Sequence, residues 1–403
     1  MASKEYDILL CGVTGFTGRL CAEHLLENVQ GVTWAACARN AKKAEAVLAE
    51  VCAKTGKPAP PVEVADLVCA DAEAEEKLRA VVKKARVVLT TAGPFEKYGQ
   101  TLVKLCAEEG VHYADITGET DFVRKMIEQH DATARKTGAS IVPHCGNDCV
   151  PWDLTVLKFH EAAAAKGSTI SEVKTYTEVP PGFGVSGGTL TTAVFQLGKK
   201  RGGAKPAFDA LLTNAGGAKS AYAFKNASLK GDKHVAEFGR AAGPWIMAPV
   251  MTNCVRRSNA LLGYADGLTY GEQQLRDPSF VNRTKDSFFA GLVGAAVALP
   301  SVFGPLLPKP GEGPARADME AGWLRVHGRA KLADGGAMVS TFEFGEDTGY
   351  LGTARMLVEC GVLLAAGPKS SGVITPAVAF GSGLLEHLEK TTPTTFTLAE
   401  APP

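Results

Sequence analysis

Three glycines near the N-terminus have a spacing that suits dinucleotide binding. Gly12, Gly15 and Gly18 follow a short apolar run, Ile8–Cys11, and precede residues with helical spacing. In a strand–turn–helix unit of this kind, one glycine permits the tight turn, one lets a pyrophosphate approach the backbone, and one lets the helix pack closely on the strand. Free N–H groups at the helix N-terminus then bind the anion. An ordinary glycine turn is the alternative. The predicted cradle comprises Gly12, Thr14, Gly15, Phe16, Thr17 and Gly18.

The residue after the second predicted strand, Val32–Ala38, stands where NAD-binding and NADP-binding enzymes differ. NAD enzymes carry an acidic residue here, which holds the ribose hydroxyls. This chain has Arg39 and Asn40 instead. A guanidinium can pair with the 2′-phosphate of NADP in a bidentate fork, whereas a carboxylate would repel that phosphate. We therefore expect NADP(H) in preference to NAD(H), with a solvated Arg39 as the alternative. Asp71, at the end of the third predicted strand, is expected to meet the adenine.

Residues that could deliver a proton follow the fourth, fifth and sixth predicted strands. In a doubly wound sheet, the carboxyl ends of these strands face the nicotinamide half of the cofactor. We expect the cofactor to be lined here by Ala92, Gly93 and Pro94. The candidate proton donors are Tyr98, Asp115, Glu119 and Asp148. Tyr98 is preferred because a phenol can donate to an enolate oxygen or a carbanion, and Asp115 is the second choice. Each has a structural alternative: Tyr98 packing on the cofactor, and Asp115 binding loop backbone.

The elements that must position these residues alternate between strand and helix as far as residue 150. This alternation predicts a Rossmann-type, doubly wound parallel sheet over residues 5–150. The pattern then changes to strand-like segments between glycine-rich loops: Ile170–Val179, Ala221–Phe224, Pro249–Cys254 and Gly322–Leu332. We expect a mixed α+β domain for substrate binding and dimerisation over 151–345. A C-terminal helical segment, 346–403, is expected to return to the Rossmann domain.

Composition excludes some classes of function. The chain has 403 residues with 43 basic and 43 acidic side chains, so it lacks the net positive charge typical of nucleic-acid binding. Its ten cysteines form no C-x-x-C pair, which is typical of reduced thiols in a cytosol-like compartment. We see no signal or transit pattern at the N-terminus. His112 and His144 lack partners at metal-ligand spacing, so we predict no metal.

One uncharged segment, residues 288–307, is unusually apolar. A spanning helix needs about 20 predominantly apolar residues, but Pro300, Gly304 and Pro305 interrupt this run. The segment could contact a membrane or lipid surface, or it could be a buried helix or a subunit contact. We accordingly expect a location on the cytoplasmic side, with peripheral attachment to a membrane or lipid droplet if the segment meets lipid.

Motifs in a fixed order along nearly the whole chain resemble those of the saccharopine dehydrogenase-like oxidoreductases, which include trans-acting enoyl reductases. The motifs are Gly12–Gly18, Ala38–Asn40, Ala92–Phe95 with Tyr98–Gly99, His112–Glu119, Ser186–Thr189, Arg257–Ser258, Pro310–Pro314, Asp347–Tyr350 and Gly372–Ala377. The sequence departs from the family at Asn147-Asp148-Cys149, where relatives usually have Phe-Asp-Ser. The resemblance implies a Rossmann domain, a mixed α/β second domain, NAD(P)-linked hydride chemistry and a homodimer.

These observations lead to one preferred function and two alternatives. The preferred function is NADP(H)-dependent reduction of an enoyl or carbonyl group in a small lipophilic substrate. The first alternative is a non-catalytic Rossmann scaffold on a lipid surface or in a larger assembly. The second is a saccharopine dehydrogenase-type amino-acid oxidoreductase, for which the sequence offers no recognisable cluster of basic residues.

Overall fold

The structure, a computed structural model, divides the chain into two units and describes residues 4–180, 209–214, 216–227, 232, 234–245, 247–276 and 311–401. The first unit consists mainly of Met1–Val150 and Gly349–Thr392. The second consists mainly of Pro151–Asn214, Lys219–Thr348 and Pro393–Pro403. The apolar segment 288–307 lies outside the described residues.

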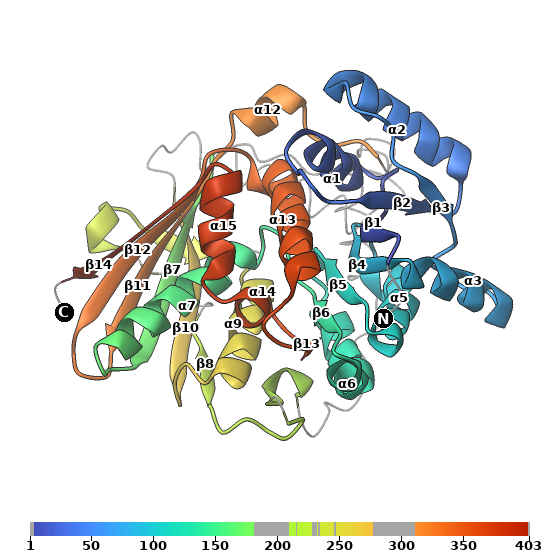
Figure 1. The fold of residues 1–403 in the computed structure, drawn as a ribbon. Helices are drawn as coiled ribbons and strands as arrows, with labels where there is room; N and C mark the ends of the chain where they lie inside the picture. Colours follow the sequence, from blue (N-terminus) through green and yellow to red (C-terminus); the bar gives the residue numbers. More distant parts are fainter. Residues whose placement is uncertain are drawn as a thin grey trace, which may run out of the picture. The chain divides into compact units, whose positions relative to one another are not determined.

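The first unit is built on a parallel sheet of seven strands (Figure 1) in the order β13-β6-β5-β4-β1-β2-β3. The strands are β1 (Tyr6–Cys11), β2 (Trp34–Ala38), β3 (Val62–Val64), β4 (Ala85–Thr90), β5 (His112–Asp115), β6 (Ser140–Val142) and β13 (Gly372–Val373). Strand order reverses between β1 and β4, and in open α/β sheets this switch point is where ligands bind. The predicted Rossmann-type sheet is therefore confirmed. The third strand, which the sequence predicts over residues 62–70, is shorter, since it ends at Val64.

Helices cover both faces of this sheet, as a parallel sheet that is buried on both sides requires. The helices are α1 (Phe16–Glu27), α2 (Ala41–Thr55), α3 (Ala72–Lys83), α4 (Phe95–Tyr98), α5 (Gln100–Glu109), α6 (Thr120–Thr137), α13 (Thr353–Ala366), α14 (Pro376–Phe380) and α15 (Gly383–Thr391). Helix α1 contacts α2 and α13, whereas α5 contacts α3 and α6.

The C-terminal helices return to the first unit, as predicted. Helix α13 lies on β1, β4 and β5, the part of the sheet next to α1. It approaches β4 closely because Gly361 has no side chain: a Cβ there would lie 2.7 Å from Leu89 Cδ1. Among the described residues, only the helical stretch Thr348–Ala366 has the length and hydropathy of a membrane span, but 67% of its most apolar window is buried. Coverage of the sheet accounts for this apolar composition.

A buried carboxylate joins three helices of this unit. Glu359 on α13 accepts from His24 of α1 through Oε1 and from His387 of α15 through Oε2, each at 2.6 Å. Burial raises the pKa of Glu359, but the hydrogen bonds and charges of the two histidines outweigh this effect, and the pKa is lowered overall.

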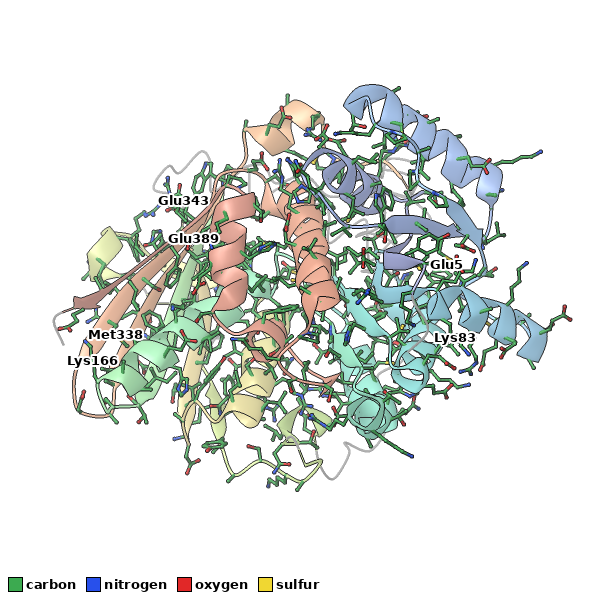
Figure 2. The ribbon with its side chains drawn as sticks, viewed as in Figure 1. Glu5, Lys83, Lys166, Met338, Glu343 and Glu389 are labelled. Carbon is green, nitrogen blue, oxygen red and sulfur yellow. The ribbon has the colours of Figure 1, made fainter. Side chains whose placement is uncertain are left out.

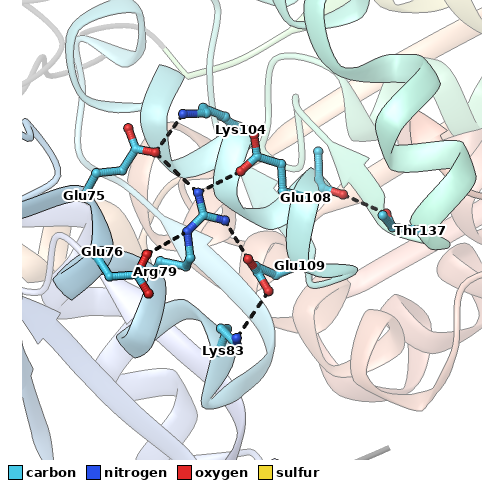
Figure 3. A network of polar contacts seen from close by, with 9 residues as sticks. Glu75, Glu76, Arg79, Lys83, Lys104, Glu108, Glu109 and Thr137 are labelled. Atoms are coloured by element: carbon cyan, nitrogen blue, oxygen red, sulfur yellow. Dashed lines mark hydrogen bonds and ion pairs between the residues drawn. The ribbon is translucent and has the colours of Figure 1, made fainter. Parts of the chain in front are cut away.

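A charged network joins α3 to α5, on the face of this sheet opposite α13 (Figure 3). The Arg79 guanidinium contacts Glu75 and Glu76 on its own helix, and Glu108 and Glu109 on α5. Its distances to these carboxylates run from 2.5 to 3.3 Å. The hydrogen bonds that Arg79 donates to Glu109 and Glu108 raise the pKa of Arg79, so the guanidinium stays charged.

The second unit holds a mixed sheet in the order β14-β12-β11-β7-β10-β8, with β9 paired to β10. The strands are β7 (Ile170–Glu178), β8 (Phe224–Asn226), β9 (Ala242–Pro244), β10 (Leu268–Leu275), β11 (Leu324–Leu332), β12 (Ala337–Phe344) and β14 (Thr394–Ala401). The helices are α7 (Val150–Ala165), α9 (Ala248–Leu262) and α12 (Arg316–Glu320), with 3-10 turns at Ala210–Leu212 and Ala236–Phe238. A π-helical turn at Thr348–Gly352 begins the C-terminal part of the first unit, which starts at Gly349. Arg325 and Glu343 pair across β11 and β12 at 3.0 Å, and Glu343 is labelled in Figure 2.

Three predicted segments of the second half differ from the structure, and one of them, Ala221–Phe224, overlaps β8 only at Phe224. Pro249–Cys254, predicted as a strand, lies in α9, where proline occupies the first turn, a position that needs no backbone N–H. Residues Thr394–Ala401, expected within the C-terminal helical segment, form β14, which pairs with β12 in an antiparallel register. The β-branched and aromatic residues of Thr394–Thr397 favour a strand there.

A buried carboxyl also lies in the second unit, on β10. Glu272 accepts from the Thr177 hydroxyl at 2.5 Å, from the Tyr270 hydroxyl at 3.2 Å, and from the Thr175 hydroxyl. Burial raises the pKa of Glu272 to about 8 in spite of these hydrogen bonds.

Candidate functional site

The glycine turn has the geometry that a phosphate cradle needs. Gly12 ends β1 with φ of +94°, a conformation that side chains other than glycine rarely adopt. A Cβ on Gly18 would lie 2.1 Å from the Gly12 carbonyl oxygen, so α1 can approach the turn only with glycine at this position. Among the described residues, a Cβ on Gly15 would meet only that same oxygen, at 3.3 Å, and the rest of its surroundings are open.

This open side coincides with the N-terminus of α1. The N–H groups in the first turn of a helix have no intrahelical partners, so they are available to an anion. Phe16 and Thr17 begin the helix here, and Thr14 precedes it. The residues present therefore fit the pyrophosphate of a dinucleotide.

The loop after β4 lies directly beside the glycine turn. The Thr91 amide donates to the Cys11 carbonyl at 3.1 Å, and a Cβ on Gly12 would lie 2.7 Å from Thr91 Oγ1. Ala92, Gly93 and Pro94 continue this loop, with a cis peptide bond between Gly93 and Pro94. The structure thus brings together the first and fourth strand ends at the switch point, as the cofactor assignment requires.

The residues assigned to the adenosine half follow β2 and β3. Arg39 is exposed at the end of β2, next to the strand from which α1 starts. The Asn40 side chain accepts from the Lys43 amide at 3.0 Å and caps α2. The Asp71 side chain accepts from the Ala74 amide at 2.8 Å and caps α3. Both therefore cap helices, and the cofactor contacts expected of them stay predictions.

A polar network joins the loops after β5 and β6. Asp115 is fully buried and accepts from the Tyr113 hydroxyl at 2.7 Å, the Thr117 amide at 3.0 Å and the His144 amide at 3.3 Å. Burial raises the pKa of Asp115, although hydrogen bonds from Tyr113 and the two amides oppose this rise. The carboxyl of Asp115 is therefore occupied by backbone and by Tyr113, which is the structural alternative considered for it.

The same network extends to the loop after β4 and positions Tyr98. The Glu119 amide donates to Thr117 Oγ1 at 3.0 Å. The two carboxylate oxygens of Glu119 accept from the Phe95 amide at 2.7 Å and the Glu96 amide at 3.0 Å. Glu119 thereby fixes the start of α4, the helix that ends in Tyr98. The Tyr98 side chain is partly buried, with the Lys97 ammonium 5.0 Å from its ring centroid.

His144 is the residue that the sequence analysis missed most clearly. It is the one non-glycine residue with positive φ (+69°) in the described part of the chain, and it is buried. Strained backbone of this kind clusters at functional sites. Its Nδ1 lies 2.6 Å from the Thr117 carbonyl oxygen, which accepts its proton. Burial lowers the pKa of His144, but Cys149 and Asp115 outweigh that effect and hold the pKa at about 9.

The C-terminal helices also contribute to this end of the first unit. The Thr353 hydroxyl accepts from the Asn147 amide at 3.0 Å. The Tyr350 ring packs edge-on against the Phe16 ring, with centroids 5.4 Å apart. The sequence analysis assigned neither Tyr350 nor Thr353 to the site. The family motif Asp347–Tyr350 pointed to this part of the chain, but a motif alone does not show which residues Tyr350 contacts.

Comparison with known proteins identifies the family. The family model described as the saccharopine dehydrogenase NADP binding domain matches residues 8–142. A trans-acting enoyl reductase of Mycobacterium tuberculosis is 31% identical over 414 residues, covering 96% of each chain. The chain belongs to the saccharopine dehydrogenase-like family of oxidoreductases. A trans-acting enoyl reductase of Mycobacterium ulcerans is 30% identical over 415 residues and covers 97% of each chain.

Solved structures agree with this family at the level of fold. The apo saccharopine dehydrogenase (L-Glu forming) of Saccharomyces cerevisiae aligns with a TM-score of 0.61, at 12% identity, over 98% of this chain and 100% of that one. The homospermidine synthase of Legionella pneumophila, in complex with NAD, aligns with a TM-score of 0.58, at 8% identity, over 98% and 92%. With the NADP-binding domain matched in sequence, the cofactor of this family member is NADP(H), as predicted. Within the described residues, no group of three or more metal-ligating side chains could hold an ion.

Proposed function

We propose that this protein uses NADPH to reduce the carbon–carbon double bond of an enoyl group carried by a separate, lipophilic partner molecule. One observation carries the proposal: the chain aligns over 96% of its length with proteins named trans-acting enoyl reductases. The cradle formed by Gly12, Gly15 and Gly18 supports it independently, because it fits the pyrophosphate of the required cofactor.

The residues of the first unit have distinct tasks in this reaction. NADPH, when bound, supplies a hydride. The glycine turn and the first turn of α1 hold the pyrophosphate, and Arg39 pairs with the 2′-phosphate. Tyr98 donates a hydrogen bond to the substrate carbonyl oxygen, where negative charge develops as the double bond is reduced. Glu119 keeps Tyr98 in place through the two amides at the start of α4.

Cofactor selectivity is tested by titrating the protein with NADPH and NADH and following nicotinamide fluorescence. Tighter binding of NADPH is expected. A charge-assisted hydrogen bond contributes about 1.5–3 kcal/mol, so Arg39→Glu should weaken NADPH binding roughly tenfold to a hundredfold while sparing NADH. Lys57→Glu, an exposed residue near the end of α2, controls for the change in net charge. Unchanged selectivity in Arg39→Glu would contradict the role of Arg39.

Activity is tested by following NADPH oxidation with α,β-unsaturated acyl thioesters of N-acetylcysteamine of increasing chain length. We expect the rate to rise with chain length, because the substrate is proposed to be lipophilic. Consumption of the double bond is verified by mass spectrometry of the product. A protein that binds NADPH but reduces none of these thioesters would support the scaffold alternative.

We further propose that the protein works as a homodimer on the cytoplasmic side, in contact with a lipid surface through residues 288–307. The support is the uncharged composition of that segment and the family resemblance. Sedimentation of the purified protein tests the dimer. Flotation with phospholipid vesicles, comparing the full chain with a chain in which residues 288–307 are replaced by a Gly/Ser linker, tests lipid contact. Equal flotation of the two chains would reject it.

A further inference from the structure

Reduction of an enoyl group requires a proton as well as a hydride, and most acids at this end of the first sheet are unable to supply it. Asp115 is fully buried, and its carboxyl accepts three hydrogen bonds from the protein. Both oxygens of Glu119 accept from backbone amides, and its side chain is buried as well. Because donors of the protein occupy both of these buried carboxyl groups, neither is open to a substrate carbon.

Asp148 differs from both in burial and in bonding. It lies on the loop between β6 and α7, so it follows the sixth strand at the carboxyl end of the sheet. The residue is partly exposed. Among the described residues, one hydrogen bond to its carboxyl is seen, from the Asn147 side-chain amide at a long 3.4 Å. A substrate therefore has little to displace in order to reach this carboxyl.

The loop that carries Asp148 is rigidly held. At its start, His144 donates its amide to Asp115 and its ring Nδ1–H to the Thr117 carbonyl. In its middle, Gly146 leaves little room for a side chain: a Cβ would lie 3.1 Å from Thr353 Cγ2 and 3.2 Å from Ile116 Cγ2. At its end, the Cys149 and Val150 amides donate to the Gly146 carbonyl at 3.2 and 3.1 Å. Such preorganisation is what a proton donor needs if it is to act at a fixed carbon.

We propose that Asp148 is the catalytic acid that protonates the α-carbon of the substrate, and that His144 is its positioning residue. The assignment rests on the proposed enoyl reduction. The substrate π bond breaks as the β-carbon gains the hydride, and the electron pair moves to the α-carbon and the carbonyl oxygen. The Asp148 O–H bond then breaks, its proton forms the new C–H bond at the α-carbon, and water reprotonates the carboxylate. NADPH is oxidised and the substrate is reduced by two electrons.

The electrostatics of the loop suit this role. Asp148 is only partly exposed, and the protein around its carboxyl withdraws it from water and raises its pKa to about 6, while the His144 imidazolium and the Asn147 side-chain amide limit the rise. A catalytic acid is most effective when its pKa is near the working pH. The charged group that faces Asp148 among the described residues is His144, which is itself balanced by Cys149 and Asp115. Loss of the His144 charge should therefore raise the pKa of Asp148 further.

The test compares Asp148→Asn, Asp148→Glu and His144→Gln with the wild type, using an octenoyl thioester of N-acetylcysteamine and NADPH. Because the protonated carboxyl is the active form, wild-type kcat should fall as pH rises through about 6. General acid catalysis contributes roughly 10²–10⁴-fold, so Asp148→Asn should lose at least a hundredfold in kcat together with this pH dependence. Asp148→Glu should recover part of kcat, and its kcat should fall with rising pH around a different midpoint (the pH limb). His144→Gln should move the limb to higher pH.

Two further measurements separate catalysis from folding. The Kd for NADPH should stay within about twofold of wild type in Asp148→Asn, because the glycine turn is unchanged. A difference proton titration of ligand-free wild type and Asp148→Asn should show one group with a midpoint near pH 6. Asp121→Asn, at an exposed aspartate on α6, is the matched control and should retain wild-type kcat.

The outcomes distinguish this assignment from the proposed function. An active wild type with an equally active Asp148→Asn, or an Asp148→Asn that keeps the pH limb, would overturn the assignment alone. A wild type that reduces no enoyl thioester would overturn the proposed function and the assignment with it. If Asp148→Asn failed to fold, Asp148→Glu would decide the question, because an undisplaced limb in that variant would reject the role of Asp148.

Discussion

Substitution of the three turn glycines by alanine should separate their roles. At Gly18 the added Cβ would lie 2.1 Å from the Gly12 carbonyl oxygen, and 2.6 Å from the carbonyl carbon. Carbon and oxygen atoms in contact need more than 3 Å, so α1 or the turn must move by roughly 1 Å, which costs about 1–3 kcal/mol. The N–H groups that bind the pyrophosphate move with them. Loss of one or two charge-assisted hydrogen bonds, at about 1.5–3 kcal/mol each, weakens NADPH binding about a hundredfold or more.

Gly15 gives a different expectation. Its φ of −88° suits alanine, and the added Cβ would have only the Gly12 oxygen nearby, at 3.3 Å. Gly15→Ala should therefore fold normally, yet bind NADPH weakly because the methyl group occupies the open side of the turn. Gly383→Ala in α15 is the control: nothing lies within 4 Å of its Cβ position, so it should leave both properties intact.

Thermal denaturation and NADPH fluorescence titration of the three variants check this reasoning. We expect Gly18→Ala to lose stability and binding, Gly15→Ala to lose binding alone, and Gly383→Ala to lose neither. Wild-type affinity in Gly18→Ala would refute the argument, because it would mean that the turn tolerates a side chain at its most crowded point. Wild-type affinity in Gly15→Ala would place the pyrophosphate elsewhere.

Three predictions concern stability. Glu359→Gln should destabilise the protein by about 3–5 kcal/mol at neutral pH, because it removes one partner from a buried charged cluster with His24 and His387. Because the pKa of Glu359 is lower in the folded state, this carboxylate adds stability at pH values above its unfolded-state pKa. That stability is lost as the pH falls through its folded-state pKa. The urea midpoint of wild type should therefore drop more steeply in acid than the midpoint of Glu359→Gln. The pKa of Glu272 is raised to about 8 in the folded state, so the free energy of unfolding should fall as the pH rises from the unfolded-state pKa to about 8. The slope should be at most about 1.4 kcal/mol per pH unit. Glu272→Gln should flatten this decline. Arg79→Met should lower the free energy of unfolding by about 1 kcal/mol, because it leaves four carboxylates of α3 and α5 without their shared guanidinium. Urea titrations should show a larger loss at low salt than at high salt.

The first unit could be predicted from sequence because its signals are local. The apolar run before Gly12 and the helical spacing after Gly18 lie within one strand–turn–helix unit, and the same alternation is repeated along the chain. The return of α13 to the sheet was also predictable in outline. A parallel sheet needs cover on both faces, and α13 occupies the part over β4 and β5.

The second unit was predicted less well because its short apolar segments do not have a distinctive period. Pro249–Cys254 is compatible with a strand or with the start of a helix, and only its packing decides. The strand Thr394–Ala401 depends on a partner, β12, that lies about fifty residues earlier in the chain. The backbone strain at His144 could not be predicted either, because it results from hydrogen bonds to Asp115 and Thr117 on another loop.

Hydrogen bonding and burial together decide which acid at this edge is free to react. Asp115, Glu119 and Asp148 lie at or after the ends of strands of one sheet, and the sequence favours Asp115 over the other two as a proton donor. In the structure, Asp115 and Glu119 are buried and accept from the backbone of neighbouring loops, so their removal should disturb the fold around Tyr98. Asp148 is partly exposed with a single long hydrogen bond, so its removal should disturb chemistry instead. A non-catalytic scaffold needs no proton donor, so an Asp148 that acts as an acid would argue against that alternative.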